Sequence, residues 1–199
     1  MKIIVIGASG TVGKAVVEQL GLRHDIVAVG TSSGQYQADI GDIAQVRAVF
    51  EQVGKVDAVV VAAGQLAFAP LAELTPEQFR VGLDSKLMGQ VNVAQVAQDF
   101  LNDGGSITLT SGILSEQPIR NGASASMVNA AVEGYARGAA IELPRGLRIN
   151  VVSPTLLTES LDSYGPYFRG FETVPASRVA LAYSRSVEGA QTGQVYKVW

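Results

Sequence analysis

The chain has 199 residues, 47% of them hydrophobic and 17% charged, which excludes a disordered protein because enough apolar surface is present to offset chain entropy. A formal net charge of −3 provides no broad basic surface, so nucleic acid is not expected as a partner. The absence of cysteine excludes disulfides and thiolate metal sites. The single histidine, His24, has no second ligand at metal-binding spacing. We therefore predict no metal site and expect His24 to be a solvated turn residue.

No apolar run approaches the roughly 18 residues that a membrane span needs. The first residues run from a short apolar stretch directly into a glycine loop, without the cationic segment and cleavage site of a secretory signal. We expect a cytoplasmic protein that makes no contact with a membrane.

Short β-branched runs alternate with amphipathic segments along the chain. The first run, Lys2–Ile6, is apolar throughout and indicates a strand buried on both faces of a parallel sheet. Further strands are expected at Asp25–Val29, Asp57–Ala62, Ser106–Thr110, Leu147–Val152 and Gln194–Trp199. Helices are expected at Thr11–Leu20, at Asp42–Val53, from Thr75 to about Leu101, at Ser124–Leu143 and at Ser177–Val187.

This alternation predicts an α/β fold, a Rossmann-like, doubly wound parallel sheet in a three-layer α/β/α arrangement, with residues 1–199 forming one dinucleotide-binding domain. One connection is unusual, because only nine residues separate Val29 from Asp39. A helical crossover takes at least roughly 10–12 residues. The helix between the second and third strands is therefore expected to be missing, and the strand around Tyr36–Ala38 to be vestigial.

The segment GASGTVG, Gly7–Gly13, leaves the first strand and opens the first helix. In this setting glycines permit a tight turn and a close approach of the backbone to a pyrophosphate, which the free N–H groups of the first helical turn can bind. The predicted phosphate-binding residues are Gly7, Ser9, Gly10, Thr11, Val12 and Gly13.

The end of the second strand bears on the choice between NAD and NADP. NAD sites usually place an acidic residue there to bind the ribose 2′-hydroxyl, whereas this chain has Thr31, Ser32 and Ser33. Small hydroxyl side chains can receive a 2′-phosphate, although no arginine stands beside them in the sequence. We favour NADP(H) as the cofactor, with NAD as the alternative.

The order of these and later motifs resembles the short-chain dehydrogenase/reductase family over the whole chain. The further segments that carry the resemblance are Ala38-Asp39-Ile40, Ala62-Ala63-Gly64, Ile107–Ser111, Ala130–Gly134, Arg148–Pro154 and Thr192-Gly193-Gln194. The resemblance implies an oxidoreductase that acts on a carbonyl or alcohol substrate. It assigns further cofactor contacts to Asp39, Ile40, Ala62, Ala63, Gly64, Asn129, Pro154 and Thr158.

The chain departs from the family at the residues that move protons. In register with Ala130–Gly134, the family's catalytic tyrosine is Ala125, its lysine is Asn129, and its asparagine on the preceding long helix is Lys86; the serine corresponds to Ser111. Relative to the family, the lysine and the asparagine have thus exchanged positions. Our hypothesis is that Lys86 and Ser111 polarise the substrate oxygen while Asn129 contacts the nicotinamide ribose. Alternatively, Lys86 is a surface charge and Asn129 is bonded to its own helix backbone.

Other tyrosines are weaker candidates for the missing proton donor. Tyr135 lies ten residues beyond Ala125, about 15 Å along the same helix and off its face. Tyr164 and Tyr167 belong to the segment Thr155–Thr173, where the family's substrate lid would be. We expect these aromatic residues, with Phe168 and Phe171, to pack a lid or an interface and not to catalyse.

Three functions follow from these observations. The first is an NADP(H)-dependent oxidoreductase with altered proton-transfer groups. The second is a binding protein that senses the nicotinamide nucleotide, and the third, which the intact phosphate loop disfavours, is a scaffold without a ligand. We also expect a homodimer or homotetramer, formed through the helices Val81–Leu101 and Ser124–Leu143 and favoured by the apolar tail Gln194–Trp199.

Overall fold

The protein folds around a seven-stranded sheet of parallel strands in the order β3-β2-β1-β4-β5-β6-β7, in a computed structural model that describes every residue from Met1 to Trp199. The strands are β1 (Lys2–Ile6), β2 (Asp25–Gly30), β3 (Tyr36–Gln37), β4 (Val56–Val61), β5 (Leu101–Thr110), β6 (Arg148–Pro154) and β7 (Val195–Val198). The predicted Rossmann-like α/β fold is confirmed. The order reverses after β1, which places the crevice between β1 and β4 where such sheets bind ligands.

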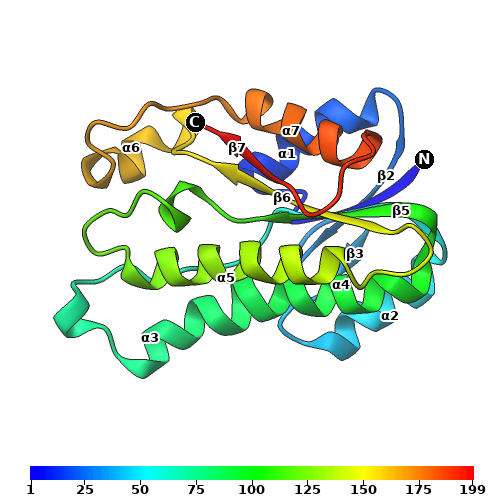
Figure 1. The fold of residues 1–199 in the computed structure, drawn as a ribbon, viewed down its shortest axis with the longest axis horizontal. Helices are drawn as coiled ribbons and strands as arrows, with labels where there is room; N and C mark the ends of the chain where they lie inside the picture. Colours follow the sequence, from blue (N-terminus) through cyan, green and yellow to red (C-terminus); the bar gives the residue numbers. More distant parts are fainter.

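Helices cover both faces of the sheet (Figure 1). They are α1 (Thr11–Gly21), α2 (Ile43–Val53), α3 (Pro76–Arg80), α4 (Gly89–Phe100), α5 (Ala123–Ala140), α6 (Leu161–Tyr164) and α7 (Ala176–Glu188). The apolar sides of α2, α4 and α5 form one core with the sheet, and those of α1 and α7 form the other. The three predicted layers follow from these two cores.

The connection between β2 and β3 contains no helix, as its length predicts. β3 is only two residues long, and it pairs with β2 through Val29 and Tyr36 and through Gly30 and Gln37. The expectation of a vestigial edge strand is confirmed.

One strand boundary is wrong. The fifth strand was expected at Ser106–Thr110, but β5 already begins at Leu101, which pairs with Val56 across an irregularity in the register. The predicted last strand at Gln194–Trp199 is confirmed as β7, which pairs with β6 and buries Tyr196 and Val198 in the core on the α7 side.

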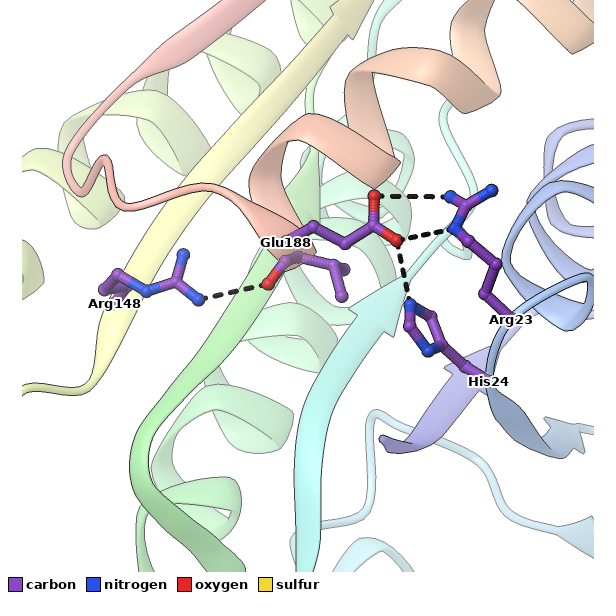
Figure 2. Close-up of polar contacts among 5 residues, drawn as sticks. Arg23, His24, Arg148 and Glu188 are labelled. Atoms are coloured by element: carbon purple, nitrogen blue, oxygen red, sulfur yellow. Dashed lines mark hydrogen bonds and ion pairs between the residues drawn. The ribbon is translucent and has the colours of Figure 1, made fainter.

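His24 is a further correction (Figure 2). Its side chain is only 11% exposed, and its Nε2 lies 2.9 Å from Oε1 of Glu188, the last residue of α7. Arg23 pairs with the same carboxylate at 3.0 Å. Arg148 on β6 donates to the main-chain oxygens of Ser186 at 2.8 Å and Val187 at 3.1 Å. Three basic side chains therefore gather at the C-terminus of α7, where the helix dipole favours them.

None of the helices is long and apolar enough to cross a bilayer.

Candidate functional site

The glycine loop between β1 and α1 has no room for side chains at two positions. Gly7 has a φ of +80°, and a Cβ atom there would overlap the main-chain oxygen of Ala62 on the neighbouring connection. A Cβ atom on Gly13 would overlap the main-chain oxygen of Gly7. Both glycines are therefore required for the first turn of α1 to lie tightly against the end of β1.

The first turn of α1 presents free amide groups. Gly10 is the N-cap and supplies no side chain, and the main-chain N–H groups of Thr11, Val12 and Gly13 have no acceptor within the protein. Ser9 and Gly10 are exposed, so solvent and ligands reach this turn. The arrangement fits a pyrophosphate, whose oxygens would accept from these N–H groups at the positive end of the helix dipole.

A cavity of about 550 Å³ lies beside this loop, between the ends of β2 and β4 and the start of the long helix. It is lined by the predicted cofactor residues Thr31, Asp39, Ile40, Ala63 and Gly64, and also by Gly41, Gln65, Glu77, Arg80, Val81, Asp84 and Ser85. One carboxylate oxygen of Asp39 accepts from the N–H of Gly41 at 2.9 Å, which fixes the turn. Ser32 and Ser33 are exposed but do not line the cavity.

Arg80 is a residue that the sequence did not point to. No arginine lies beside Thr31 along the chain. Arg80 comes from α3, 49 residues later, and lines the same cavity as Thr31. No carboxylate pairs with its guanidinium.

Lys86 lies in a π-helical segment, Val81–Met88 (η2), that connects α3 to α4. Gly64, with a φ of +128°, brings the turn after β4 against this segment, and a Cβ atom there would lie 2.6 Å from the Cα of Lys86. The Lys86 side chain is 9% exposed, and its Nζ donates to the main-chain oxygen of Ser111 at 3.0 Å. Burial lowers the pKa of Lys86 to about 8. The alternative of a surface charge is therefore wrong.

Asn129 extends from α5 into a second cavity, which Lys86 also lines. It is 2% exposed, its Oδ1 has no hydrogen-bond partner, and it makes no bond to its own helix backbone. A Cβ atom on Gly112 would lie 3.2 Å from its Nδ2, so the glycine leaves room for the amide. A buried acceptor without a donor is costly, and it fits a ligand that supplies a hydroxyl or amide hydrogen.

Ser111 directly follows β5 and lines this cavity, but its hydroxyl is hydrogen-bonded to another residue. The Oγ donates to Oε1 of Glu133 on α5 at 2.9 Å, and Ser111 is 3% exposed. Ala125, at the position of the family's tyrosine, is fully buried and packs with Ile113 and Leu114. The predicted set of Ser111, Lys86 and Asn129 is thus brought together, with Ser111 offering its main-chain oxygen to Lys86.

The cavity that contains Lys86 and Asn129 has a volume of about 520 Å³. Its other lining residues are Gly64, Gln65, Leu66, Phe68, Ser111, Gly112, Ile113, Leu114, Pro154, Thr155, Leu156, Leu157, Ser160, Tyr164 and Phe168. Gly64 and Gln65 line both cavities, so the two meet at the turn after β4. Thr158 does not line this cavity, because its hydroxyl donates to Thr173 Oγ1 at 3.2 Å.

The aromatic residues of the segment after β6 pack as a lid over the outer end of this cavity. Tyr164 and Phe68 face each other with ring centroids 6.4 Å apart. Phe168 and Phe171 meet edge-on at 5.4 Å and pack against the cluster of Ile113, Leu114 and Ala125. The expected packing role of these aromatics is confirmed. Tyr135 packs against the sheet core and lines none of this cavity.

Comparison with known proteins decides the family. A family model described as "Enoyl-(Acyl carrier protein) reductase" matches residues 11–196. The chain belongs to the short-chain dehydrogenase/reductase family. A solved relative of the family, the protein lin1944 from Listeria innocua, shares 53% identity over the full length of both chains with a TM-score of 0.98.

Three further relatives connect the family to redox chemistry. A small-chain dehydrogenase solved in complex with NADPH is 27% identical, with a TM-score of 0.88 over 100% of this chain and 96% of its own. A tetrahydroxynaphthalene reductase of Pestalotiopsis fici is 31% identical over 76% of this chain and 64% of its own length. An uncharacterized oxidoreductase of Methylorubrum extorquens is 32% identical over 70% of this chain and 59% of its own length. The chain thus spans about three fifths of these curated relatives.

Proposed function

We propose that the protein is an NADP(H)-dependent oxidoreductase that interconverts a carbonyl compound and the corresponding alcohol. The observation that carries this proposal is the pairing of a buried, cationic Lys86 with an unpartnered Asn129 in one cavity at the carboxyl edge of the sheet. The apolar remainder of that cavity suits a substrate with one polar group.

The two cavities and the glycine loop together offer groups for each part of the cofactor. Thr31, Asp39, Ile40 and Ala63 would hold the adenosine, the amides of Thr11–Gly13 the pyrophosphate, and Asn129 with Pro154 the nicotinamide riboside. When bound, the nicotinamide supplies or accepts the hydride. The solved relative with NADPH supports the phosphorylated form, and Arg80, which lines the same cavity as Thr31, would bind its 2′-phosphate.

Lys86 takes the role of the proton donor in this proposal. Its ammonium group has three N–H donors, one of which is held by the main-chain oxygen of Ser111. With a pKa of about 8, Nζ carries a proton at neutral pH and can release it to the substrate oxygen as negative charge develops there. In the direction of alcohol oxidation, the neutral amine takes up that proton. The Oδ1 of Asn129 would accept from a ribose hydroxyl.

The lid favours an aromatic or otherwise apolar substrate. Phe68, Tyr164 and Phe168 line the cavity and offer rings against which a flat substrate can stack. A relative named as a tetrahydroxynaphthalene reductase supports the same chemical class.

A nucleotide-sensing binding protein remains a second candidate. It is favoured by Ala125, which provides no proton donor at the family's tyrosine position and is fully buried. Such a protein would bind NADPH with the same residues but would turn over no substrate.

The deciding experiment starts with binding. NADPH and NADH are titrated into the purified protein by nicotinamide fluorescence and thermal stabilisation, with Arg80→Gln beside the wild type. We expect NADPH to bind more tightly than NADH. Arg80→Gln should weaken the binding of NADPH by about tenfold and the binding of NADH by much less, because only NADPH carries the 2′-phosphate. Binding of neither near millimolar concentration would reject both the oxidoreductase and the sensor.

A second step separates the oxidoreductase from the sensor. Aromatic ketones are screened for oxidation of NADPH by the wild type and by Lys86→Met. Loss of a general acid typically lowers kcat about 10²–10⁴-fold, and we expect that loss with NADPH affinity retained. No turnover of any carbonyl by a protein that binds NADPH would favour the sensor.

A further inference from the structure

Glu133 is a buried carboxylate that neither the family motif nor the proposed proton transfer uses. It lies on α5 one turn after Asn129 and is 4% exposed. Its Oε1 accepts from the hydroxyl groups of both Ser111, at 2.9 Å, and Ser115, at 2.7 Å. A buried carboxylate is tolerated only when hydrogen bonds replace its water, so these two serines are the partners that keep Glu133 in the interior.

Ser111 connects this carboxylate to Lys86. Its hydroxyl donates to Glu133, while its main-chain oxygen accepts from Lys86 Nζ at 3.0 Å. The preceding residue is fixed independently, because the Gln90 side chain accepts from the N–H of Thr110 at 2.7 Å and donates to its carbonyl at 2.9 Å. The end of β5 is thus held from two helices, with one buried charge on each side of Ser111.

The surrounding charges are few. Arg137 lies one turn after Glu133 on α5, with its guanidinium 3.9 Å from Oε2, and it is 57% exposed, so it compensates the carboxylate only weakly. Asp84 shares the π-helical segment with Lys86 but is exposed. Tyr164 is the other titratable residue in the lining of the cavity.

We propose that Glu133 is a positioning residue for Lys86. It holds the segment Ser111–Ser115 so that the main-chain oxygen of Ser111 directs the Lys86 ammonium group into the substrate cavity. Ser111 then contributes to the site through its main-chain oxygen, and its hydroxyl serves to anchor the segment to Glu133. The use of the cavity rests on the proposed function, but the arrangement itself can be tested without cofactor or substrate.

The test measures the titration of Lys86 in the free protein. The chain contains five lysines, Lys2, Lys14, Lys55, Lys86 and Lys197, so ¹³Cε-lysine labelling gives a simple NMR spectrum, and the signal missing in Lys86→Met identifies Lys86. Glu133→Gln keeps the size of the side chain and an acceptor for the serines but removes the negative charge. We expect the midpoint of the Lys86 titration to fall, because a neutral acceptor anchors Ser111 more weakly than a carboxylate does, and the main-chain oxygen of Ser111 favours the protonated amine.

Glu116→Gln is the matched control. Its carboxylate pairs with exposed Lys197 at 2.7 Å, so the variant should change the Lys197 signal and leave Lys86 unchanged. If Glu133→Gln does not fold, Glu133→Asp replaces it. The shorter side chain keeps a buried charge but cannot hold both serines, and the midpoint should fall by a few tenths of a pH unit. An unmoved midpoint in whichever variant folds would overturn the proposal.

The role of the Ser111 hydroxyl is tested separately, through kcat. Ser111→Ala retains the main-chain oxygen, so kcat on a carbonyl substrate should stay within about tenfold of the wild type, far less than the loss of a general acid. A loss of a hundredfold or more with an unmoved Lys86 midpoint would identify the hydroxyl as the proton donor and overturn this part of the proposal. Failure of NADPH to bind would reject the proposed function and leave the titration result intact.

Discussion

Lys86 is the residue on which the chemistry of this site depends, and its environment can be tested through stability. Its pKa is about 8 in the folded protein and about 10.5 in the unfolded chain. Between these values the unfolded chain binds more protons, so the free energy of unfolding rises with pH across that window. Below pH 8 the full cost of burying the charge is present, on the order of 3 kcal/mol.

Lys86→Met removes this cost. We expect the variant to be more stable than the wild type at pH 7 by about 1–3 kcal/mol, since the lost hydrogen bond to Ser111 offsets part of the gain. The advantage should shrink as the pH rises from 8 to 10.5. Urea unfolding at pH 7 and pH 10 measures both effects, and Lys14→Met, at an exposed position on α1, is the control. Equal stability of Lys86→Met and wild type at pH 7 would show that the ammonium is not desolvated.

The residues of the site were predictable to different degrees. Gly7, Gly13, Lys86 and Asn129 were found because motif order fixes their places on the sheet and helices. The sequence did not reveal that the Ser111 hydroxyl points to Glu133, because a motif determines a position and not a side-chain rotamer. Arg80 was missed for another reason: it approaches Thr31 from a distant part of the chain.

At the scale of elements, the long helix from Thr75 to about Leu101 was predicted as one continuous helix. Its boundaries follow from the capping box of Thr75 and Gln78 and from Leu101, where the chain becomes extended. The π-helical turn at Val81–Met88 was not predicted, since hydrophobic periodicity does not distinguish a local widening of the helix. Such widened turns are frequent at functional sites, and this one contains Lys86.

The contact between α7 and the start of β2 gives a prediction at the same scale (Figure 2). The hydrogen bond from Arg23, with a smaller contribution from His24, lowers the pKa of Glu188 against the opposing effect of burial. A carboxyl group whose pKa is lowered in the folded protein stabilises the fold at pH values above its pKa in the unfolded chain, about 4.3. This stabilisation is lost as the pH falls through the pKa in the folded protein. Because the carboxylate is 33% exposed, the contribution is expected to be at most about 1 kcal/mol.

Glu188→Gln should therefore lower the free energy of unfolding at pH 7 by up to about 1 kcal/mol and by less at pH 3, where the carboxyl group of the unfolded chain is already protonated. Urea titrations at the two pH values make the comparison. Glu18→Gln, at an exposed residue of α1 without an ion-pair partner, should not change the free energy of unfolding at either pH. A loss of the same size at pH 3 would assign the effect to packing and not to charge.

For the whole molecule, the parallel sheet followed from the alternation of strands and helices, and the missing crossover helix from the nine residues between Val29 and Asp39. The C-terminal segment was predicted as the last strand, and its apolar residues were also taken to favour association. The strand is present as β7, and its pairing with β6 buries Tyr196 and Val198 within the chain. The expectation of association now rests on the outer face of α5.

That face carries small and apolar residues with open space around them. Met127 is 41% exposed, and a Cβ atom on Gly134 or Gly138 would meet nothing within 4 Å. We expect two copies to pack α5 against α5, since glycines on a helix surface let backbones approach closely. Light scattering coupled to size exclusion should give two or four times the chain mass of 20.8 kDa.

Gly134→Glu with Gly138→Glu should convert the assembly to a monomer without unfolding it. Both positions are open in the single chain, and glutamate is a better helix former than glycine, so any loss of association comes from the charges placed in the interface. Ala48→Glu, at an exposed position of α2, should leave the mass unchanged. If the double variant keeps the wild-type mass, the chains associate through another surface, and if the wild type is already a monomer, the α5 face has no partner in a second copy.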